Sequence, residues 1–301
     1  MLKEFAVQPS VVSNWTACRF LMDKFGYGRG RVISRYPKSW TRMVYESLNG
    51  LGPMEKKRIE VGLTRLKEAL YARHHEWDSA REWVDNALEE HRQRPFCAII
   101  ADNACGQSPG IIREEDLDEE DEPRWKAEVQ RHIDRTATEM ATCAETLLRN
   151  AKHILLVDPY FNPQAQRFRR PFEAFLRAAG NRDPGIPIER IEVHTGDSAA
   201  GTKAFFDGEC KKYLPRHIPS GLKVRLVRWD QNYLHNRYVL TERGGLKFST
   251  GLDDHDGGTR SHDVVDLLAP GPYAQIWGEY QRNNSTFPLK EDDLIIEGIA
   301  S

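Results

Sequence analysis

Residues 234–242 read Leu-His-Asn-Arg-Tyr-Val-Leu-Thr-Glu, and residues 248–253 follow closely with Phe-Ser-Thr-Gly-Leu-Asp. The apolar centre of the first stretch predicts a β-strand. Because side chains at i and i+2 of a strand point to the same side, we expect His235 and Arg237 to share a face. A guanidinium binds phosphate, and an imidazole beside it can attack or transfer a proton. Glu242 lies beyond the expected strand end, where its carboxylate is placed to orient a histidine of this chain or of a partner.

The stretch resembles the phospholipase D superfamily signature, His-x-Lys-x4-Asp-x6-Gly-Ser-x-Asn. This chain has His235-x-Arg237-x4-Glu242, followed by Ser249-Thr250-Gly251, so Arg replaces Lys, Glu replaces Asp and the tail is approximate. Arginine is a good phosphate clamp, so the replacement of Lys by Arg is compatible with anion binding. The His-x-Arg form is similar to the phospholipase-D-like domain at the carboxy terminus of eukaryotic MIT-domain proteins, which is thought to bind membranes without catalysis. The resemblance covers about two thirds of the chain, residues 92–288.

The resemblance implies a mechanism that needs two motifs, whereas this chain carries one. A catalytic site would therefore require a twofold dimer that brings two His235 side chains together. One His235 would form a phosphohistidine and the other would protonate the leaving oxygen. Arg237 would stabilise the equatorial oxygens, and Glu242 would hold an imidazole tautomer. Ser249 and Thr250 would donate further hydrogen bonds. The scheme uses no metal or other cofactor.

Residues 154–163 read Ile-Leu-Leu-Val-Asp-Pro-Tyr-Phe-Asn-Pro, an apolar run followed by turn residues. The run predicts a buried strand ending at Asp158. Its end resembles the strand ending in Pro-Tyr-Phe of phospholipase-D-like domains, which reaches the rim of the active site. Because strand carboxyl ends form crevices in open α/β sheets, Asp158 and Tyr160 are candidate substrate-binding residues. Asp230 and His194 have comparable positions and rank below Asp158.

The composition is that of an ordinary globular protein. The chain has 301 residues, 40% hydrophobic and 29% charged, with a net charge of −2. That charge argues against a strongly basic nucleic-acid binder but not against a local basic patch. No apolar run approaches the roughly 18 residues that span a membrane, and the amino terminus lacks a signal-peptide apolar region, so we expect a cytoplasmic protein. The cysteines are scattered without a CxxC pair, which favours buried free thiols over a disulfide framework or zinc knuckle.

Residues 1–91 are expected to form a mostly helical N-terminal region, because apolar residues between Ile59 and Ala87 recur at helical spacing. The glycine-rich loop 26–31 has no preceding strand and no Gly-Lys-Ser/Thr, so nucleotide binding there is disfavoured. Residues 31–42 are basic with interleaved aromatics. They could contact nucleic acid or another anionic surface, but we favour arginine and lysine stems covering a small helical domain.

Residues 92–301 are expected to form an α/β domain, a layered sheet with helices on its faces in the element order of one phospholipase-D-like unit. The acidic run 114–122 is expected to be a solvated, mobile loop. We expect strands at 96–101, 154–158, 191–194, 222–229, 237–241, 246–249 and 263–268, and helices at 123–151, 172–179, 199–213 and 273–281.

One further cluster has side chains of metal-ligand type: Asp253, Asp254, His255 and Asp256, with His262 and Asp263 beyond two glycines. An exposed polar loop with Asp/Gly turns is the favoured interpretation.

Two hypotheses follow. The favoured one, narrowly, is a phospholipase-D-like module that binds a phosphate-bearing ligand, either nucleic acid or a phospholipid head group, or a protein partner. It would act within a bacterial multi-protein assembly such as an antiviral-defence system. The alternative is a homodimeric, metal-independent phosphodiesterase or nuclease with a phosphohistidine intermediate.

Overall fold

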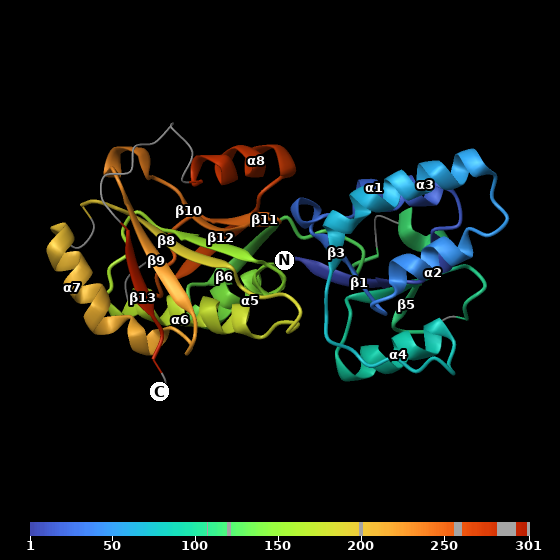
Figure 1. Ribbon diagram of the computed structural model, residues 1–301, viewed down its shortest axis with the longest axis horizontal. Coiled ribbons are helices and arrows are strands. Elements are labelled where there is room, and N and C mark those ends of the chain that lie inside the picture. Colours follow the sequence, from blue (N-terminus) through green and yellow to red (C-terminus); the bar gives the residue numbers. More distant parts are fainter. Residues whose placement is uncertain (107, 119–121, 199–200, 256–260, 282–292, 300–301) are drawn as a thin grey trace. The chain divides into compact units, whose positions relative to one another are not determined.

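The chain forms two compact units, each with its own sheet. The computed structural model describes residues 1–106, 108–118, 122–198, 201–255, 261–281 and 293–299 (Figure 1). The N-terminal unit is Leu2–Glu128, and the C-terminal unit is Val129–Ser301 together with Met1. Both units combine helices with a sheet, which confirms the general α/β class.

The N-terminal unit is built on five parallel strands in the order β3-β2-β1-β4-β5. Phe5 and Val7 belong to one hydrophobic core and Ala6 to another, because side chains alternate across a strand. Both faces of the sheet are therefore covered, as in other parallel sheets. The elements are β1 (Lys3–Val7), α1 (Trp15–Lys24), β2 (Arg31–Ser34), α2 (Trp40–Ser47), α3 (Pro53–Leu66), β3 (Leu70–Tyr71), α4 (Trp83–Gln93), β4 (Ala98–Ala101) and β5 (Ile111–Arg113), with 3-10 turns η1 (Pro9–Val11), η2 (Tyr27–Arg29), η3 (Lys67–Ala69) and η4 (Glu114–Asp118).

This unit differs from the helical region expected over residues 1–91. β1 pairs with β2 on one side and with β4 on the other, so residues 92–128 complete the first sheet instead of starting the second. The strands have two to five residues, and charged residues such as Lys3 and Arg31 interrupt their apolar pattern. Short strands of this kind leave little periodicity to detect.

Two expected surface segments contribute to this core. Tyr36 and Trp40 are buried, and Trp40 Nε1 donates a hydrogen bond to the Val7 carbonyl at 2.6 Å. The aromatic rings of residues 31–42 are therefore unavailable to an anionic surface. The acidic run was expected to be a solvated loop, but its residues 114–118 form η4 and Leu117 is buried in this core. Residues 119–121 lie outside the described part of the chain.

The C-terminal unit is built on an eight-stranded mixed sheet in the order β13-β9-β8-β7-β10-β11-β12-β6. β7, β8 and β9 are parallel, and the other neighbouring pairs are antiparallel. The elements are β6 (Gln130–Asp134), α5 (Ala137–Arg149), β7 (His153–Val157), α6 (Gln166–Gly180), β8 (Arg190–Gly196), α7 (Lys203–Tyr213), β9 (Lys223–Trp229), β10 (Arg237–Thr241), β11 (Gly244–Phe248), β12 (His262–Leu267), α8 (Pro270–Glu279) and β13 (Leu294–Glu297), with η5 (Pro215–His217) and η6 (Gln231–Tyr233).

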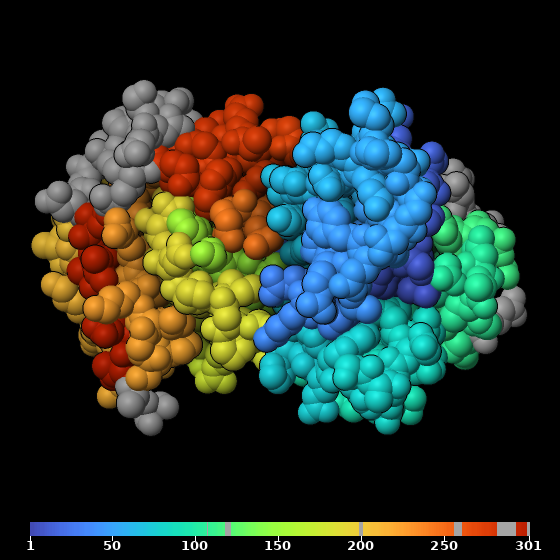
Figure 2. Space-filling model, turned by 45° about the vertical axis from the view of Figure 1, so that its right-hand side comes forward, coloured from blue at the N-terminus to red at the C-terminus, as the bar shows by residue number. Residues whose placement is uncertain are grey.

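Helices cover both faces of this sheet. Figure 1 shows α5 and α6 on one face and α8 on the other. Leu155 and Leu240 pack with Tyr273 and Trp277 of α8. No residue of α8 is fully buried, and Figure 2 shows this helix, in orange-red, at the surface. The strands expected between residues 154 and 281 and the helices expected at 199–213 and 273–281 are confirmed within a few residues at their ends. The helix expected at 172–179 is also present, as α6, but it begins earlier, at Gln166.

The expected helix over residues 123–151 is wrong in its first half. Trp125 is buried in the N-terminal core, and Ile133 is the one buried side chain of edge strand β6, so their helical spacing is coincidental. α5 begins only after Thr136, whose hydroxyl accepts a hydrogen bond from the Glu139 amide at 3.2 Å. This contact is an N-cap, which fixes a helix start.

Strand direction brings several loops to one edge of the C-terminal sheet, the carboxyl edge. β7, β8 and β9 end there, at Val157, Gly196 and Trp229. β10 runs antiparallel to β7, so it begins at the same edge, at Arg237. β11 ends there as well, at Phe248.

The five cysteines are free, and three of them are buried. Within the described residues, no helix is long and apolar enough to cross a membrane.

Candidate functional site

Arg237 is the first residue of β10, at the carboxyl edge, and His235 lies two residues earlier, in the loop and not in the strand as expected. This loop, residues 230–236, starts at the end of β9 and crosses the ends of β8 and β7 to reach β10. The Gln231 amide donates to Asp197 Oδ1 at 3.1 Å, which ties the loop to the residue after β8. A Cβ at Gly196 would lie 3.0 Å from the Pro159 carbonyl oxygen and 1.7 Å from Gln231 Oε1, so a larger residue would displace the Gln231 side chain and press on the backbone at Pro159. Leu234 is buried, and the next residue, His235, is exposed.

Arg237 has a guanidinium that makes no ion pair with a carboxylate of the described residues. Its Nη1 donates to the His235 carbonyl at 3.0 Å, and its guanidinium carbon lies 5.2 Å from the centre of the Tyr160 ring. The Nε atom is buried and makes no hydrogen bond within the described structure. Among the described residues, Arg237 forms no ion pair and its Nη2 makes no hydrogen bond, so the guanidinium retains donors for an anion.

Asp158 is the buried acid next to this guanidinium. Val157 pairs with Tyr238 across β7 and β10, which places Asp158 beside Arg237. Asp158 Oδ1 accepts from the Tyr160 amide and Oδ2 from the Leu252 amide, both at 2.8 Å. Burial raises the pKa of Asp158, although the two amides and the Arg237 charge act in the opposite direction. Asp158 therefore holds the loops around Arg237 and does not face a ligand freely.

Ser249 and Thr250 also lie at this edge, where β11 ends. Ser249 is exposed, and its amide donates to the Val264 carbonyl at 3.1 Å. Thr250 is half-buried, and its amide donates to Asp263 Oδ1 at 2.9 Å. Within the described part of the chain neither hydroxyl makes a hydrogen bond, so both can donate to a ligand.

Glu242 is the expected site residue that the structure places elsewhere. It follows Thr241 at the opposite end of β10, and seven residues of extended chain span on the order of 20 Å. Its Oε1 accepts from the Lys152 amide and its Oε2 from the His153 amide, both at 3.0 Å. The carboxylate therefore fixes the start of β7 and cannot orient His235 of the same chain.

The other candidates serve the fold. His194 is buried, with Nδ1 accepting from Trp229 Nε1 at 2.8 Å and Nε2 lying 3.1 Å from Glu192. Asp230 Oδ1 accepts from the Asn232 amide at 2.9 Å and so begins η6.

The expected metal-type cluster is also engaged by other groups. Asp253 pairs with Arg135 at 2.6 Å, and Asp254 pairs with Arg170 at 2.8 Å. Asp256 lies outside the described residues, among which no group of three or more metal-ligand side chains gathers. Asp254 is buried, so the favoured interpretation of an exposed loop is also wrong for this residue.

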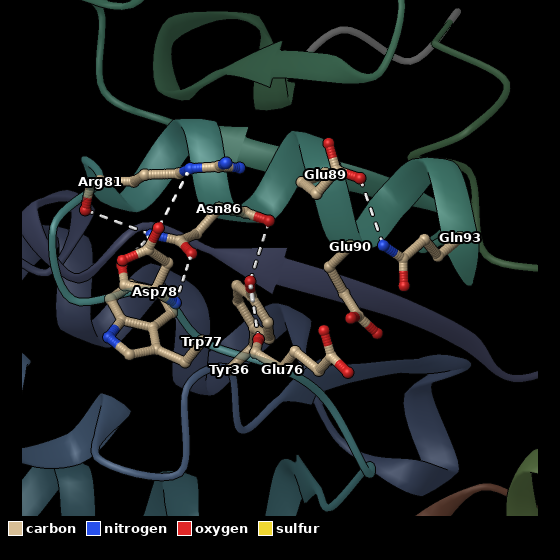
Figure 3. Close-up of a pocket in the computed structure, with 9 residues that line it drawn as sticks. All are labelled: Tyr36, Glu76, Trp77, Asp78, Arg81, Asn86, Glu89, Glu90 and Gln93. Carbon is tan, nitrogen blue, oxygen red and sulfur yellow. Dashed lines mark hydrogen bonds and ion pairs between the residues drawn. The ribbon is translucent and has the colours of Figure 1, made fainter.

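A pocket that no sequence pattern indicated lies in the N-terminal unit, between α4 and the chain segment 76–81. Its volume is about 420 Å³, and Figure 3 shows the Tyr36 hydroxyl directed at the Asn86 carbonyl of α4. Nine residues line it: Tyr36, Glu76, Trp77, Asp78, Arg81, Asn86, Glu89, Glu90 and Gln93.

Most carboxylates of this pocket already have arginine partners. Asp78 pairs with Arg81 at 3.2 Å, Glu89 pairs with Arg92 at 3.0 Å, and Glu90 pairs with Arg94 at 3.0 Å. The pocket therefore offers little uncompensated charge to a ligand.

Comparisons with known proteins do not assign a family. The chain matches no protein-family model and no curated protein. One solved structure with some similarity is that of TrmBL2, an archaeal chromatin protein described as showing a novel mode of DNA binding. The match has 13% sequence identity and a TM-score of 0.28, and it covers 54% of this chain and 53% of that chain. A similarity this low assigns neither fold nor function.

Proposed function

We propose that the C-terminal unit is a phospholipase-D-like module that binds the phosphate group of an anionic partner at Arg237, with His235 beside it. The observation that carries the proposal is the guanidinium of Arg237, held at the carboxyl edge without an ion pair among the described residues. The element order and the position of the His-x-Arg strand beside the strand ending in Asp158 support the resemblance in sequence.

We favour binding over catalysis because the His235 imidazole and the Glu242 carboxylate, which act together in the catalytic scheme, lie at opposite ends of β10. The backbone of β7 engages Glu242, so this carboxylate is not available to hold the tautomer of His235 in the same chain. The Arg237 guanidinium can bind phosphate without help from the imidazole or the carboxylate.

Titration of the full chain with dimethyl phosphate, followed by calorimetry, tests the binding proposal. Arg237→Gln should weaken binding about ten- to hundredfold, because it removes charge-assisted hydrogen bonds worth about 1.5–3 kcal/mol. His235→Ala should weaken it less. The matched control is Arg216→Gln, which removes an exposed charge in η5, beyond the C-terminal end of α7. Equal affinities for the wild type and Arg237→Gln would reject Arg237 as the anion site.

The alternative is a dimeric phosphodiesterase, and the exposure of His235 favours it, since a second chain can approach an exposed imidazole. Hydrolysis of bis-p-nitrophenyl phosphate in EDTA, with light scattering to give the oligomeric state, separates the two functions. The binding module should give no turnover. Turnover by a dimer, lost in His235→Ala, would establish the enzyme.

A further inference from the structure

Three aromatic side chains at the carboxyl edge are exposed, two of them more than the third. Tyr160, two residues after Asp158, is 56% exposed, and Phe205, in the first turn of α7, is 50% exposed, whereas Tyr233 of η6 is 47% exposed. The neighbouring Phe206 is fully buried, under the guanidinium of Arg228. The helix therefore uses one phenylalanine for the core and turns the other outward.

Both rings belong to segments that contact each other. Gln164, in the loop that carries Tyr160, donates to Glu209 of α7 at 2.7 Å. Glu209 lies four residues after Phe205 and thus on the same helix face. Tyr160 is also the ring under the Arg237 guanidinium, at 5.2 Å. The cation and two exposed rings consequently come from β10, from the loop after β7 and from the helix after β8.

Exposed rings next to a phosphate-binding cation suit two kinds of partner. A membrane surface attracts clusters of lysine and arginine, each contributing modestly, and takes up several apolar side chains. At this edge the neighbouring acids Asp197 and Asp230 oppose such an attraction, whereas Asp253 is paired with Arg135. A single-stranded nucleic acid needs fewer cations, because its bases stack on aromatic rings whatever their sequence. A duplex hides those faces, so the unpaired strand is favoured.

We propose that Tyr160 and Phe205 are base-stacking residues and that the phosphate held by Arg237 belongs to a single-stranded nucleic acid. This inference rests on the proposed phosphate-binding function and adds the class of the ligand. The Tyr160 ring stacks a base next to the phosphate on Arg237, and Phe205 stacks a further base. The site thereby prefers a strand with bases to the same backbone without them.

The test is fluorescence anisotropy with the full chain and two labelled probes of about twelve units, a length within the usual range of such sites. One probe is an oligothymidylate, and the other is an abasic phosphodiester of the same length and charge. We expect the wild type to bind the oligothymidylate at least about tenfold more tightly, since each stacked base contributes roughly that factor or more. Phe205→Ala should remove most of this preference and leave the affinity for the abasic probe unchanged.

Three variants make the result specific. Tyr160→Phe keeps a ring and should retain the preference, whereas Phe205→Leu keeps apolar bulk without a ring and should lose it. Tyr45→Ala removes a ring that is 39% exposed on α2 of the N-terminal unit and should change nothing. Circular dichroism and thermal midpoints confirm that each variant is folded.

The other outcomes overturn one proposal or both. Equal binding of the two probes, unchanged by Phe205→Ala, would retain phosphate binding and reject the stacking role. Binding to phosphatidylserine vesicles in place of either probe, lost in Phe205→Ala, would assign the rings to a membrane surface. No detectable binding of either probe or of dimethyl phosphate would reject the phosphate site itself.

Discussion

At the scale of single residues, Asp158 explains how the site is held together. Its two carboxylate oxygens bind the Tyr160 and Leu252 amides, so one side chain fixes both the loop after β7 and the turn after β11. The same burial that makes these bonds strong raises the pKa of Asp158. A buried acid beside Arg237 therefore acts through positioning, and its charge interacts with the Arg237 guanidinium.

Asp158→Ala should lower the free energy of unfolding by about 2–3 kcal/mol, because it leaves buried backbone donors without an acceptor. Asp158→Asn keeps one carbonyl acceptor and should be milder. Urea unfolding of the three proteins measures the difference. An alanine variant as stable as the wild type would show that water or a shifted loop replaces the carboxylate.

Glu122 contributes to the free energy of unfolding in a way that depends on pH. Its two oxygens accept hydrogen bonds from Arg124 Nε and Nη2, both at 2.8 Å, and these bonds lower the pKa of Glu122 from 4.5 to about 2. The folded state thus binds this proton more weakly than the unfolded state. The stabilisation is complete above pH 4.5 and is lost as the pH falls towards 2.

Glu122→Gln should therefore destabilise the N-terminal unit at pH 7 by less than about 1 kcal/mol, since the pair is partly exposed to solvent. Urea unfolding at several pH values should show the gap between the wild type and the variant closing between pH 4.5 and 2. A gap that persists at pH 2 would mean that the glutamine acts by another route.

At the scale of elements, the sequence predicts what local patterns encode. β7 and β9 are rich in Val, Ile and Leu and are bounded by turn residues, so their existence can be read directly. β6 was missed because only Ile133 is buried, and β1 because two of its five residues, Lys3 and Glu4, are charged. The pairing of β1 with β4, about ninety residues later, has no local signal at all.

The candidate site divides in the same way. Asp158 was expected near the motif, and the pairing of β7 with β10 places it beside Arg237. His235 and Arg237 were expected on one strand, but β10 begins only at Arg237 and leaves His235 in the preceding loop. Glu242 was wrongly expected near His235, because the seven-residue spacing between them runs along an extended strand and so separates the two side chains. Phe205 was missed because a helical pattern does not say which of two adjacent phenylalanines is buried.

Helix packing in the N-terminal unit depends on a glycine. A Cβ on Gly62 of α3 would lie 2.7 Å from Cys18 Sγ and 3.0 Å from Met22 Sδ, both on α1. Gly62→Ala should therefore destabilise the protein by about 1–3 kcal/mol through overpacking, despite the better helix propensity of alanine.

The matched control is Gly208→Ala in α7, where a Cβ would meet nothing within 4 Å. This variant should be neutral or more stable by up to about 1 kcal/mol. Thermal unfolding of both variants gives the comparison. Two equal shifts would indicate that α1 and α3 separate without strain.

At the scale of the whole molecule, the candidate site and the pocket belong to different units. The carboxyl edge with Arg237 lies within the C-terminal unit, and the pocket between α4 and segment 76–81 lies within the N-terminal unit. The net charge is only −2, and a long-range attraction to a polyanion is correspondingly weak. Any affinity for a nucleic acid must then come from short-range contacts.

Because short-range contacts provide the affinity, we predict that the binding of a single-stranded nucleic acid depends only weakly on salt concentration. For single strands the logarithm of affinity falls with the logarithm of salt concentration by about 0.7 per neutralised phosphate. With Arg237 as the principal phosphate contact, oligothymidylate binding should show a slope of about −1, and Arg237→Gln should bring it close to zero. Phe205→Ala should weaken binding at every salt concentration without changing the slope, because stacking releases no counterions. Anisotropy titrations from about 50 to 200 mM KCl measure all three slopes. A slope of about −4 or steeper would reveal an extended basic surface and contradict a site built on one guanidinium and two rings.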